Sequence, residues 1–314
     1  MASINGILNI NKPEGITSFK VVSWLKRLTG EKRIGHAGTL DPLATGVLPC
    51  CLGQATRIIQ FITDASKAYL AQIKLGIATD TFDREGHITH HGDISSITTA
   101  RIEEALVEFQ GLIEQRPPAY SALKHNGKRY YELARAGLPA TPRPRRVEIS
   151  KIELVSYQTA FATVKIECSK GTYIRSLAHD LGLKLGCYAH LENLSRLRCG
   201  TFCIEDALTP EQIEDAANQG ALEGLLLPTD SPLLDLPAVI VDKKKESAIA
   251  NGQCISLDTK HLNANQYCRV YSLDGNFIAM LHFASATRRW HPKRVFIVPD
   301  DSNSREPEGL TANI

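Results

Sequence analysis

The spacing of apolar residues changes along the chain between two periods, which predicts a mixture of strands and helices. Residues 68–77 and 161–168 alternate between apolar and polar positions, as in strands with one buried face. Over residues 99–110, apolar residues recur every three or four positions, as on the buried side of an amphipathic helix. The pattern therefore indicates the α+β class.

Turn and capping residues suggest where these elements begin and end. We expect strands at 5–10, 68–77, 87–91, 147–155, 161–168 and 190–204, the second and third forming a hairpin. We expect helices from an N-cap at Ser18 to Gly30, at 55–63, at 99–110 before Gly111, from Gly171–Thr172 to Gly186, and after a capping box at Thr209. The hairpins predict a mixed, largely antiparallel sheet with flanking helices. The motifs GxGxxG and GxxxxGK[ST] are absent, which argues against a nucleotide-binding parallel sheet.

A change in composition at residues 228–237 predicts a domain boundary. We expect one large domain over residues 1–235, a small β-rich module over 236–300, and a polar, disordered tail over 301–314.

Composition excludes several classes of protein. No apolar run approaches the roughly 20 residues that span a bilayer, and the N-terminus lacks the pattern of a secretory signal. None of the eight cysteines form a Cys-x-x-Cys pair, so free thiols in the reducing cytoplasm are expected. Cys199 and Cys203 could join His190 at a metal, but no fourth ligand has the required spacing, and we expect no metal site.

Positive charge is clustered although the net charge is only +2. The groups are Arg143 with 145–146, Lys243–Lys245, and Arg288–Arg289 with 293–294. Each cluster could meet phosphates or simply form a solvated face. Residues 116–137 mix tyrosines with lysines and arginines in a loop and short helix, a combination that suits stacking on bases and contact with phosphates.

The sequence GHAGTLDPLATGVLP, residues 35–49, is the strongest candidate for chemistry. Its glycines and proline disfavour a regular helix, and its apolar residues do not alternate as in a strand. We expect a tight loop that presents its one acid, Asp41, with the conformation restricted by Pro42. An Asp-Pro turn without any catalytic role is the alternative.

Four segments in order resemble the bacterial tRNA pseudouridine synthase B (TruB) family. They are GHAGTLDPLATGVLP (35–49), KAYLAQIKLG (67–76), SKGTYIRSLAHDLG (169–182) and AHLENLSRL (189–197). The resemblance covers residues 5 to about 235 and implies the pseudouridine synthase fold. The small C-terminal module more weakly resembles a PUA-like RNA-binding module.

The resemblance implies an isomerase, tRNA pseudouridine(55) synthase, that acts in tRNA processing. It would convert uridine to pseudouridine at position 55 in the T-loop, after base flipping. It implies no cofactor, a tRNA T-arm stem-loop as the RNA partner, no required protein partner, no membrane, a monomer and a cytoplasmic location.

The same resemblance assigns residues to the site. Asp41 matches the nucleophile, Arg175 an arginine that pairs with it, and Tyr69 a tyrosine that stacks on the base. The other matched positions bind substrate: His36, Tyr173, Leu194 and Asp83. Without the resemblance, Tyr69 and Leu194 would be ordinary core residues and His36 an ordinary loop residue.

Two other functions are also compatible with the sequence. An RNA-binding or tRNA-folding module would also need a pocket for a flipped base, but it has no use for a carboxylate near phosphates, which must be paired to be tolerated. A hydrolase with one carboxylate would usually need a second acid, and no paired-acid motif stands out. Synthases that work with guide RNA share the aspartate loop, but this chain lacks extended basic tails.

The basic clusters lead to a prediction about salt. Because contacts with phosphates release counterions, affinity for tRNA should fall steadily as salt rises from low to moderate concentration. Filter binding across that range measures the effect, and a dissociation constant that stays flat would contradict a role for the clusters in RNA binding.

Overall fold

The computed structural model describes residues 4–120, 124–125, 127–130, 132, 136, 138, 142–257 and 267–296. The chain forms two compact units, Met1–Leu227 and Pro228–Ile314. No helix in the described ranges is long and apolar enough to cross a membrane.

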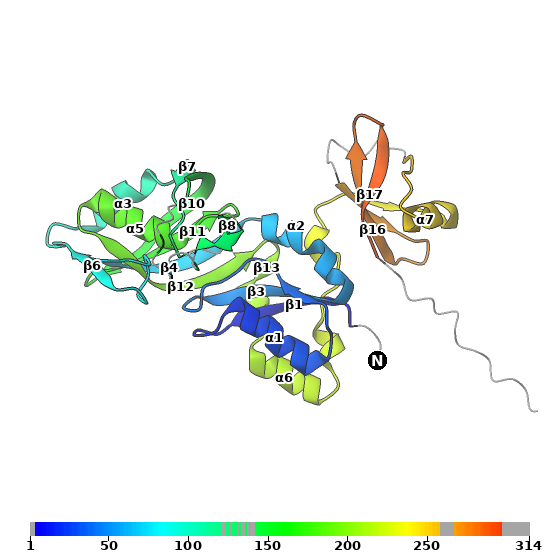
Figure 1. The fold of residues 1–314 in the computed structure, drawn as a ribbon, viewed down its shortest axis with the longest axis horizontal. Helices are drawn as coiled ribbons and strands as arrows, with labels where there is room; N and C mark the ends of the chain where they lie inside the picture. Colours follow the sequence, from blue (N-terminus) through cyan, green and yellow to red (C-terminus); the bar gives the residue numbers. More distant parts are fainter. Residues whose placement is uncertain are drawn as a thin grey trace, which may run out of the picture. The chain divides into compact units, whose positions relative to one another are not determined.

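A nine-stranded sheet forms the centre of the first unit (Figure 1). Its main path runs β1-β3-β12-β4-β11-β10-β7, and β2 and β13 pair with β3 and β12. Every pairing is antiparallel except that of β12 with β3. The mixed, largely antiparallel sheet predicted from the sequence is confirmed. Its strands are β1 (Gly6–Lys12), β2 (Ile34–His36), β3 (Thr45–Leu52), β4 (Lys67–Leu75), β7 (Gly111–Gln115), β10 (Arg145–Gln158), β11 (Phe161–Cys168), β12 (Ala189–Cys199) and β13 (Phe202–Cys203).

Helices pack on the two ends of this sheet. At one end α3 packs on β10 and α5 on β12 and β4, whereas at the other α1 packs on β2 and α6 on β1 (Figure 1). The helices of the unit are α1 (Ser18–Thr29), α2 (Ile59–Asp64), α3 (Thr99–Val107), α5 (Ile174–Leu185) and α6 (Pro210–Asn218), with 3-10 turns at Gly53–Ile58, Ile204–Asp206 and Leu222–Leu225. Two small hairpins complete it: β5 (Ile77–Thr79) with β6 (Ile88–His91), and β8 (Lys124–His125) with β9 (Lys128–Arg129).

Several boundaries differ from those expected. Thr17, not Ser18, caps α1, because the Ser18 hydroxyl is used by the backbone of Leu40. The helix expected over 99–110 ends at Val107, and Gly111 begins β7 instead of ending the helix. Helix α5 begins after Tyr173 rather than at Gly171.

Two other expected elements are split. The strand expected over 68–77 breaks at Gly76, which has a φ of 90°, so the predicted hairpin is formed by the separate strand β5. The helix expected over 55–63 is a 3-10 turn followed by the short helix α2. Most of the loop and helix expected over 116–137, and the tail over 301–314, lie outside the described residues.

The second unit contains a four-stranded sheet in the order β14-β15-β16-β17. Its elements are β14 (Ala238–Ile240), α7 (Lys243–Ala250), β15 (Tyr267–Tyr271), β16 (Phe277–Ala284) and β17 (Arg289–Val295), with a 3-10 turn at Ser231–Leu233. Buried apolar residues from β15, β16, β17 and α7 form a separate core, and the partly buried Val239 of β14 packs against it. The sequence pattern missed α7, which carries the lysine cluster 243–245 and is capped by Asp242.

The close contact between β3 and β12 depends on one glycine. Gly46 has a φ of 98°, and a Cβ at that position would lie 2.3 Å from the carbonyl oxygen of Arg196. A side chain would therefore meet both backbone strain and a direct clash with backbone that cannot move aside. This contact joins the two parts of the sheet next to the loop that carries Asp41.

We expect Gly46→Ala to lower the free energy of unfolding by more than about 2 kcal/mol, because strain and clash add. Gly15→Ala is the matched control: Gly15 has a φ of 82° but nothing within 4 Å of the added Cβ, so only the strain of about 1 kcal/mol remains. Urea unfolding measures both values. Equal destabilisation of the two variants would show that close contact with β12 is unimportant.

Candidate active site

The loop that carries Asp41 spans residues 37–44, between β2 and β3. Hydrogen bonds hold it at several points: the Ala37 N–H donates to Pro49 O at 2.9 Å, and the Leu40 N–H to Ser18 Oγ at 2.9 Å. The Ala44 N–H donates back to Asp41 O at 3.1 Å. The expected tight loop is therefore present, and its shape is fixed mainly by its own backbone and by α1.

Two buried cations, Lys12 and Arg196, also hold this loop in place. Lys12 Nζ donates to Pro42 O at 3.3 Å and to two further carbonyls in residues 13–16. Burial lowers the pKa of Lys12 to about 8, although the nearby Asp41 carboxylate opposes this shift. Arg196, from β12, donates to Gly38 O at 2.9 Å and Val47 O at 2.7 Å, so it links the start of the loop to β3.

Arg175 joins two carboxylates from different loops. Its Nε lies 3.0 Å from Asp41 Oδ2, its Nη2 3.3 Å from Asp41 Oδ1, and its Nη1 3.2 Å from Asp83 Oδ2. Nη2 also donates to Tyr120 O at 2.9 Å. Arg175 and Asp83 are buried, whereas 37% of the Asp41 side chain is exposed. Arg175 and Asp83 thus leave the Asp41 carboxylate accessible, and Arg175 keeps it in a fixed orientation.

The loop with Asp83 is built to keep that carboxylate behind Arg175. Phe82 has a φ of 65°, which is rare for a residue with a side chain, and stacks on His179 of α5 at a centroid distance of 3.9 Å. The hydroxyl of Thr81 donates to Asp83 Oδ1 at 2.6 Å. Backbone hydrogen bonds between this loop and Leu191 attach it to β12.

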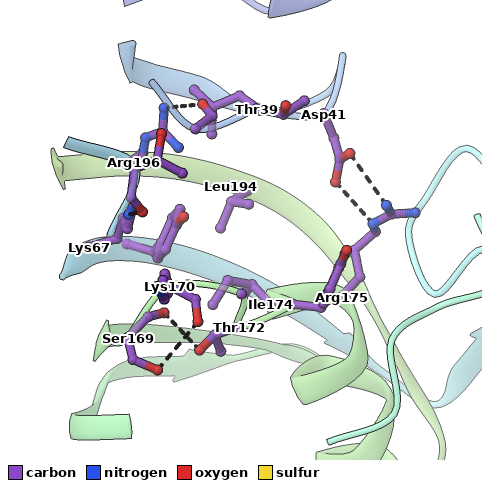
Figure 2. A pocket seen from close by; sticks show the side chains of 16 residues that line it. Thr39, Asp41, Lys67, Ser169, Lys170, Thr172, Ile174, Arg175, Leu194 and Arg196 are labelled. Carbon is purple, nitrogen blue, oxygen red and sulfur yellow. Dashed lines mark hydrogen bonds and ion pairs between the residues drawn. The ribbon is translucent and has the colours of Figure 1, made fainter. Parts of the chain in front are cut away.

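A pocket of about 250 Å³ opens beside Asp41 (Figure 2). Five of the predicted site residues line it: Asp41, Tyr69, Tyr173, Arg175 and Leu194. They come from four distant segments, the Asp41 loop, β4, the start of α5, and β12. The apolar wall contributed by Tyr69 and Leu194 and the polar wall contributed by Asp41 and Arg175 suit a flat, polar ring such as a base.

Tyr69 is held as a neutral phenol. Burial raises its pKa to about 12, although the neighbouring Arg196 guanidinium opposes this shift. Across β4 and β12, Tyr69 lies directly opposite Arg196. At neutral pH Tyr69 is therefore a phenol that can donate a hydrogen bond, and it is not a phenolate base.

His36 and Asp83 are not among the residues that line the pocket. Asp83 is behind Arg175, as described above. His36 is half-buried at the end of β2, opposite Cys50 of β3. Burial, followed by the charge of Arg196, lowers the pKa of His36 below its ordinary value of 6.5, so the ring is neutral at pH 7.

Comparison with known proteins identifies the family. Residues 26–174 match the profile of the TruB family pseudouridylate synthase N-terminal domain, and residues 175–234 match that of the tRNA pseudouridylate synthase B C-terminal domain. A Dehalococcoides mccartyi protein named tRNA pseudouridine synthase B is 45% identical over 294 residues, which are 94% of this chain and 97% of that protein. The chain belongs to the TruB family. It is an enzyme of the pseudouridine synthase type.

Other relatives agree with membership of the TruB family. A Clostridium acetobutylicum protein of the same name is 42% identical over 280 residues, 88% of this chain and 95% of that protein. Among solved structures, one of a Cbf5-Nop10-Gar1 complex contains a chain with a TM-score of 0.69 and 28% identity, covering 88% of this chain and 78% of that one. A chain in an H/ACA RNP bound to a substrate RNA containing 2'-deoxyuridine has a TM-score of 0.68 and 25% identity, covering 94% and 86%.

Sequence reasoning missed four basic residues of this TruB site, of which Lys170 lines the pocket and pairs with Asp64. Arg196 and Lys67 line the pocket, and Lys12 supports the Asp41 loop. Arg196 lies inside the segment 189–197, two residues after Leu194, but nothing in its spacing distinguishes it from an ordinary strand arginine. Lys67 and Lys12 each precede an apolar strand or turn, where a lysine is usually exposed, so pattern alone did not distinguish them.

We expect Arg175→Met to lower the free energy of unfolding by about 3–5 kcal/mol, because it leaves the buried Asp83 carboxylate without its cation. Adding Asp83→Asn to that variant should recover most of the lost stability, since the buried charge is then removed. Urea unfolding of the single and double variants measures this. A double variant no more stable than the single one would contradict the account of Asp83 as a carboxylate stabilised by Arg175.

Proposed function

We propose that this chain converts uridine to pseudouridine at position 55 in the T-loop of tRNA. The relatives named tRNA pseudouridine synthase B, at 42–45% identity over most of the chain, support the tRNA substrate. The observation that carries the proposal is the accessible Asp41 carboxylate, which the buried Arg175 orients toward the pocket that Tyr69 lines. Such an arrangement suits a nucleophile that acts on a nucleotide placed in the pocket.

In the proposed reaction, the N1–C1′ bond breaks, the uracil rotates, and C5 forms a new bond to C1′ with loss of the C5 proton. Asp41 initiates it by attack on C1′, by attack on C6, or by removal of the C2′ proton to give a glycal. All three routes need an ionised carboxylate held in one orientation, which the contacts with Arg175 provide. The reaction is redox-neutral, and the proposed roles are all filled by side chains of this chain.

The pocket residues have separate roles in the proposal. Tyr69 stacks on the uracil and, as a neutral phenol, is available to donate a hydrogen bond. Leu194 and Tyr173 bound the base on other sides. The Arg145 guanidinium lies 6.0 Å from the centroid of the Tyr173 ring, which helps to keep that ring in place.

A base within a folded T-loop must leave its stack to enter this pocket. His36 is proposed to occupy the space that the base leaves, and Asp83 to act from behind Arg175. A neutral imidazole suits that position because a flat, uncharged ring can stack on neighbouring bases. The described structure contains His36 at the end of β2, one residue before the Asp41 loop begins.

We further propose that the chain acts alone, as a monomer in the cytoplasm, with the unit that follows Leu227 serving as a PUA-like RNA-binding module. All eight cysteines are free thiols, six of them buried, which fits a reducing compartment. At the start of α7, Lys243 pairs with Asp274 and Lys245 with Asp242, whereas the exposed Lys244 is placed to meet a phosphate.

Asp41→Asn should abolish pseudouridine formation, with a loss of at least about 10³-fold, while binding of tRNA stays close to wild type. The assay follows tritium released from C5 of uridine in an unmodified tRNA transcript, with chelator present. Asp93→Asn, at an exposed aspartate on a loop after β6, is the matched control and should keep full activity.

Other outcomes of this assay would change the assignment. Release of tritium by both wild type and Asp41→Asn would retain the enzyme and remove Asp41 as nucleophile. Tight binding of the transcript without release by any variant would favour an RNA-binding or tRNA-folding module over the enzyme.

A further inference from the structure

The charges that line the pocket do not balance. Its walls include four cations, Lys67, Lys170, Arg175 and Arg196, but one carboxylate, Asp41. Two of these cations have acidic partners: Arg175 contacts Asp41 and Asp83, and Lys170 Nζ lies 2.9 Å from Asp64. The other two, Arg196 and Lys67, have no carboxylate within 4.0 Å in the part of the chain that the structure describes.

Arg196 and Lys67 lie together on one side of the pocket, across from Asp41 and Arg175 (Figure 2). Only 1% of Arg196 and 5% of Lys67 is exposed. Arg196 donates to Gly38 O and Val47 O, and Lys67 donates to Thr63 O and Ala65 O. We call these two side chains the cationic wall.

Holding carbonyl groups does not by itself explain a charge at these positions. A neutral donor would satisfy the same carbonyls without the cost of taking an unpaired charge out of water. Burial lowers the pKa of Lys67, the direction expected for a cation that lacks a compensating acid. A buried cationic wall beside an open pocket therefore points to a negative charge that is present on the pocket's contents during the reaction.

The proposed reaction generates such a charge. When the N1–C1′ bond breaks, both of its electrons go to the uracil, and the negative charge spreads over N1, O2 and O4. On the sugar side, C1′ is taken by the Asp41 carboxylate, or the C2′ proton is lost and a glycal forms. A new bond forms when C5 attacks C1′ and the Asp41 carboxylate leaves, or when C5 adds to the glycal and C2′ regains its proton. The C5 proton then leaves to solvent and N1 takes up a proton.

We propose that Arg196, supported by Lys67, stabilises the uracil anion while it is detached from the sugar. This inference rests on the proposed function and adds a division of labour between two arginines: Arg175 orients the carboxylate, and Arg196 neutralises the departing base. Arg196 also lies opposite Tyr69 in the pairing of β4 with β12, so the stacked base would lie next to its charge. In a buried site, a fixed charge acts on the anion without needing direct contact.

The test uses a better leaving group. Fluorine at C5 withdraws electrons and stabilises the detached uracil, so 5-fluorouridine needs less help from a protein cation. With a uridine transcript, we expect Arg196→Gln to lower the single-turnover rate by about 10- to 100-fold, because one preorganised charge is lost. With a 5-fluorouridine transcript, the fall in rate caused by Arg196→Gln should be several times smaller. Arg196→Lys, which keeps the charge, should lie between wild type and Arg196→Gln on uridine.

Both substrates are followed by consumption of the target nucleoside, separated by chromatography after digestion of the RNA. Arg198→Gln is the matched control: Arg198 lies on the same strand, but Glu167 pairs with it at 2.7 Å, and we expect no change in the ratio of the two rates. Thermal unfolding and tRNA affinity establish that each variant is folded and binds. If Arg196→Gln does not fold, Lys67→Met is compared with wild type on both transcripts. Its rate should also fall more on uridine than on 5-fluorouridine, by a smaller factor than expected for Arg196→Gln.

The outcomes separate this inference from the proposed function. Equal losses on uridine and 5-fluorouridine, or no loss on either, would overturn the role in charge stabilisation and leave Arg196 as a support for the Asp41 loop. A wild-type protein that makes no pseudouridine from the uridine transcript would overturn the proposed function itself, and this inference with it.

Discussion

The site depends on one buried guanidinium that is shared by two loops. Arg175, near the start of α5, is bound to Asp41 from one loop and Asp83 from another, and neither loop has a regular structure of its own. A buried cation is tolerated only where its charge is compensated, so both loops must be in place when the helix packs. The sheet supplies this arrangement, because β12 holds the Asp83 loop through Leu191 and the Asp41 loop through Arg196.

Much of the fold follows from local patterns in the sequence. The alternation in β4 and β11, the periodicity of α3, and the capping box at Thr209 all predicted elements that the structure contains. The errors have local physical causes. The Ser18 hydroxyl bonds a distant backbone instead of capping its helix, and Gly76 interrupts a pattern of alternation that is otherwise continuous. Pairing partners such as β3 with β12 depend on contacts more than a hundred residues apart, which no local pattern specifies.

The same limit applies to the site. The sequence alone indicated Asp41, because small residues around an Asp-Pro pair are unusual, and the resemblance to the family supplied Tyr69 and Arg175. These three do line one pocket with Tyr173 and Leu194, although their catalytic roles stay predictions. Neither pattern nor resemblance pointed to Arg196, since an arginine within a strand is ordinarily half-exposed, and its burial appears only when β3 packs beside β12.

The scattered origin of the pocket has a consequence for synthesis of the protein on the ribosome. The pocket needs residues 38–41, 67–69, 169–175 and 194–196, so its last wall, β12, is translated long after its first. While β12 is still inside the ribosome, the nascent chain already has the aspartate loop. It lacks the strand that anchors this loop and the cation Arg196. The order of the segments along the chain therefore leaves the site incomplete until translation has passed residue 196.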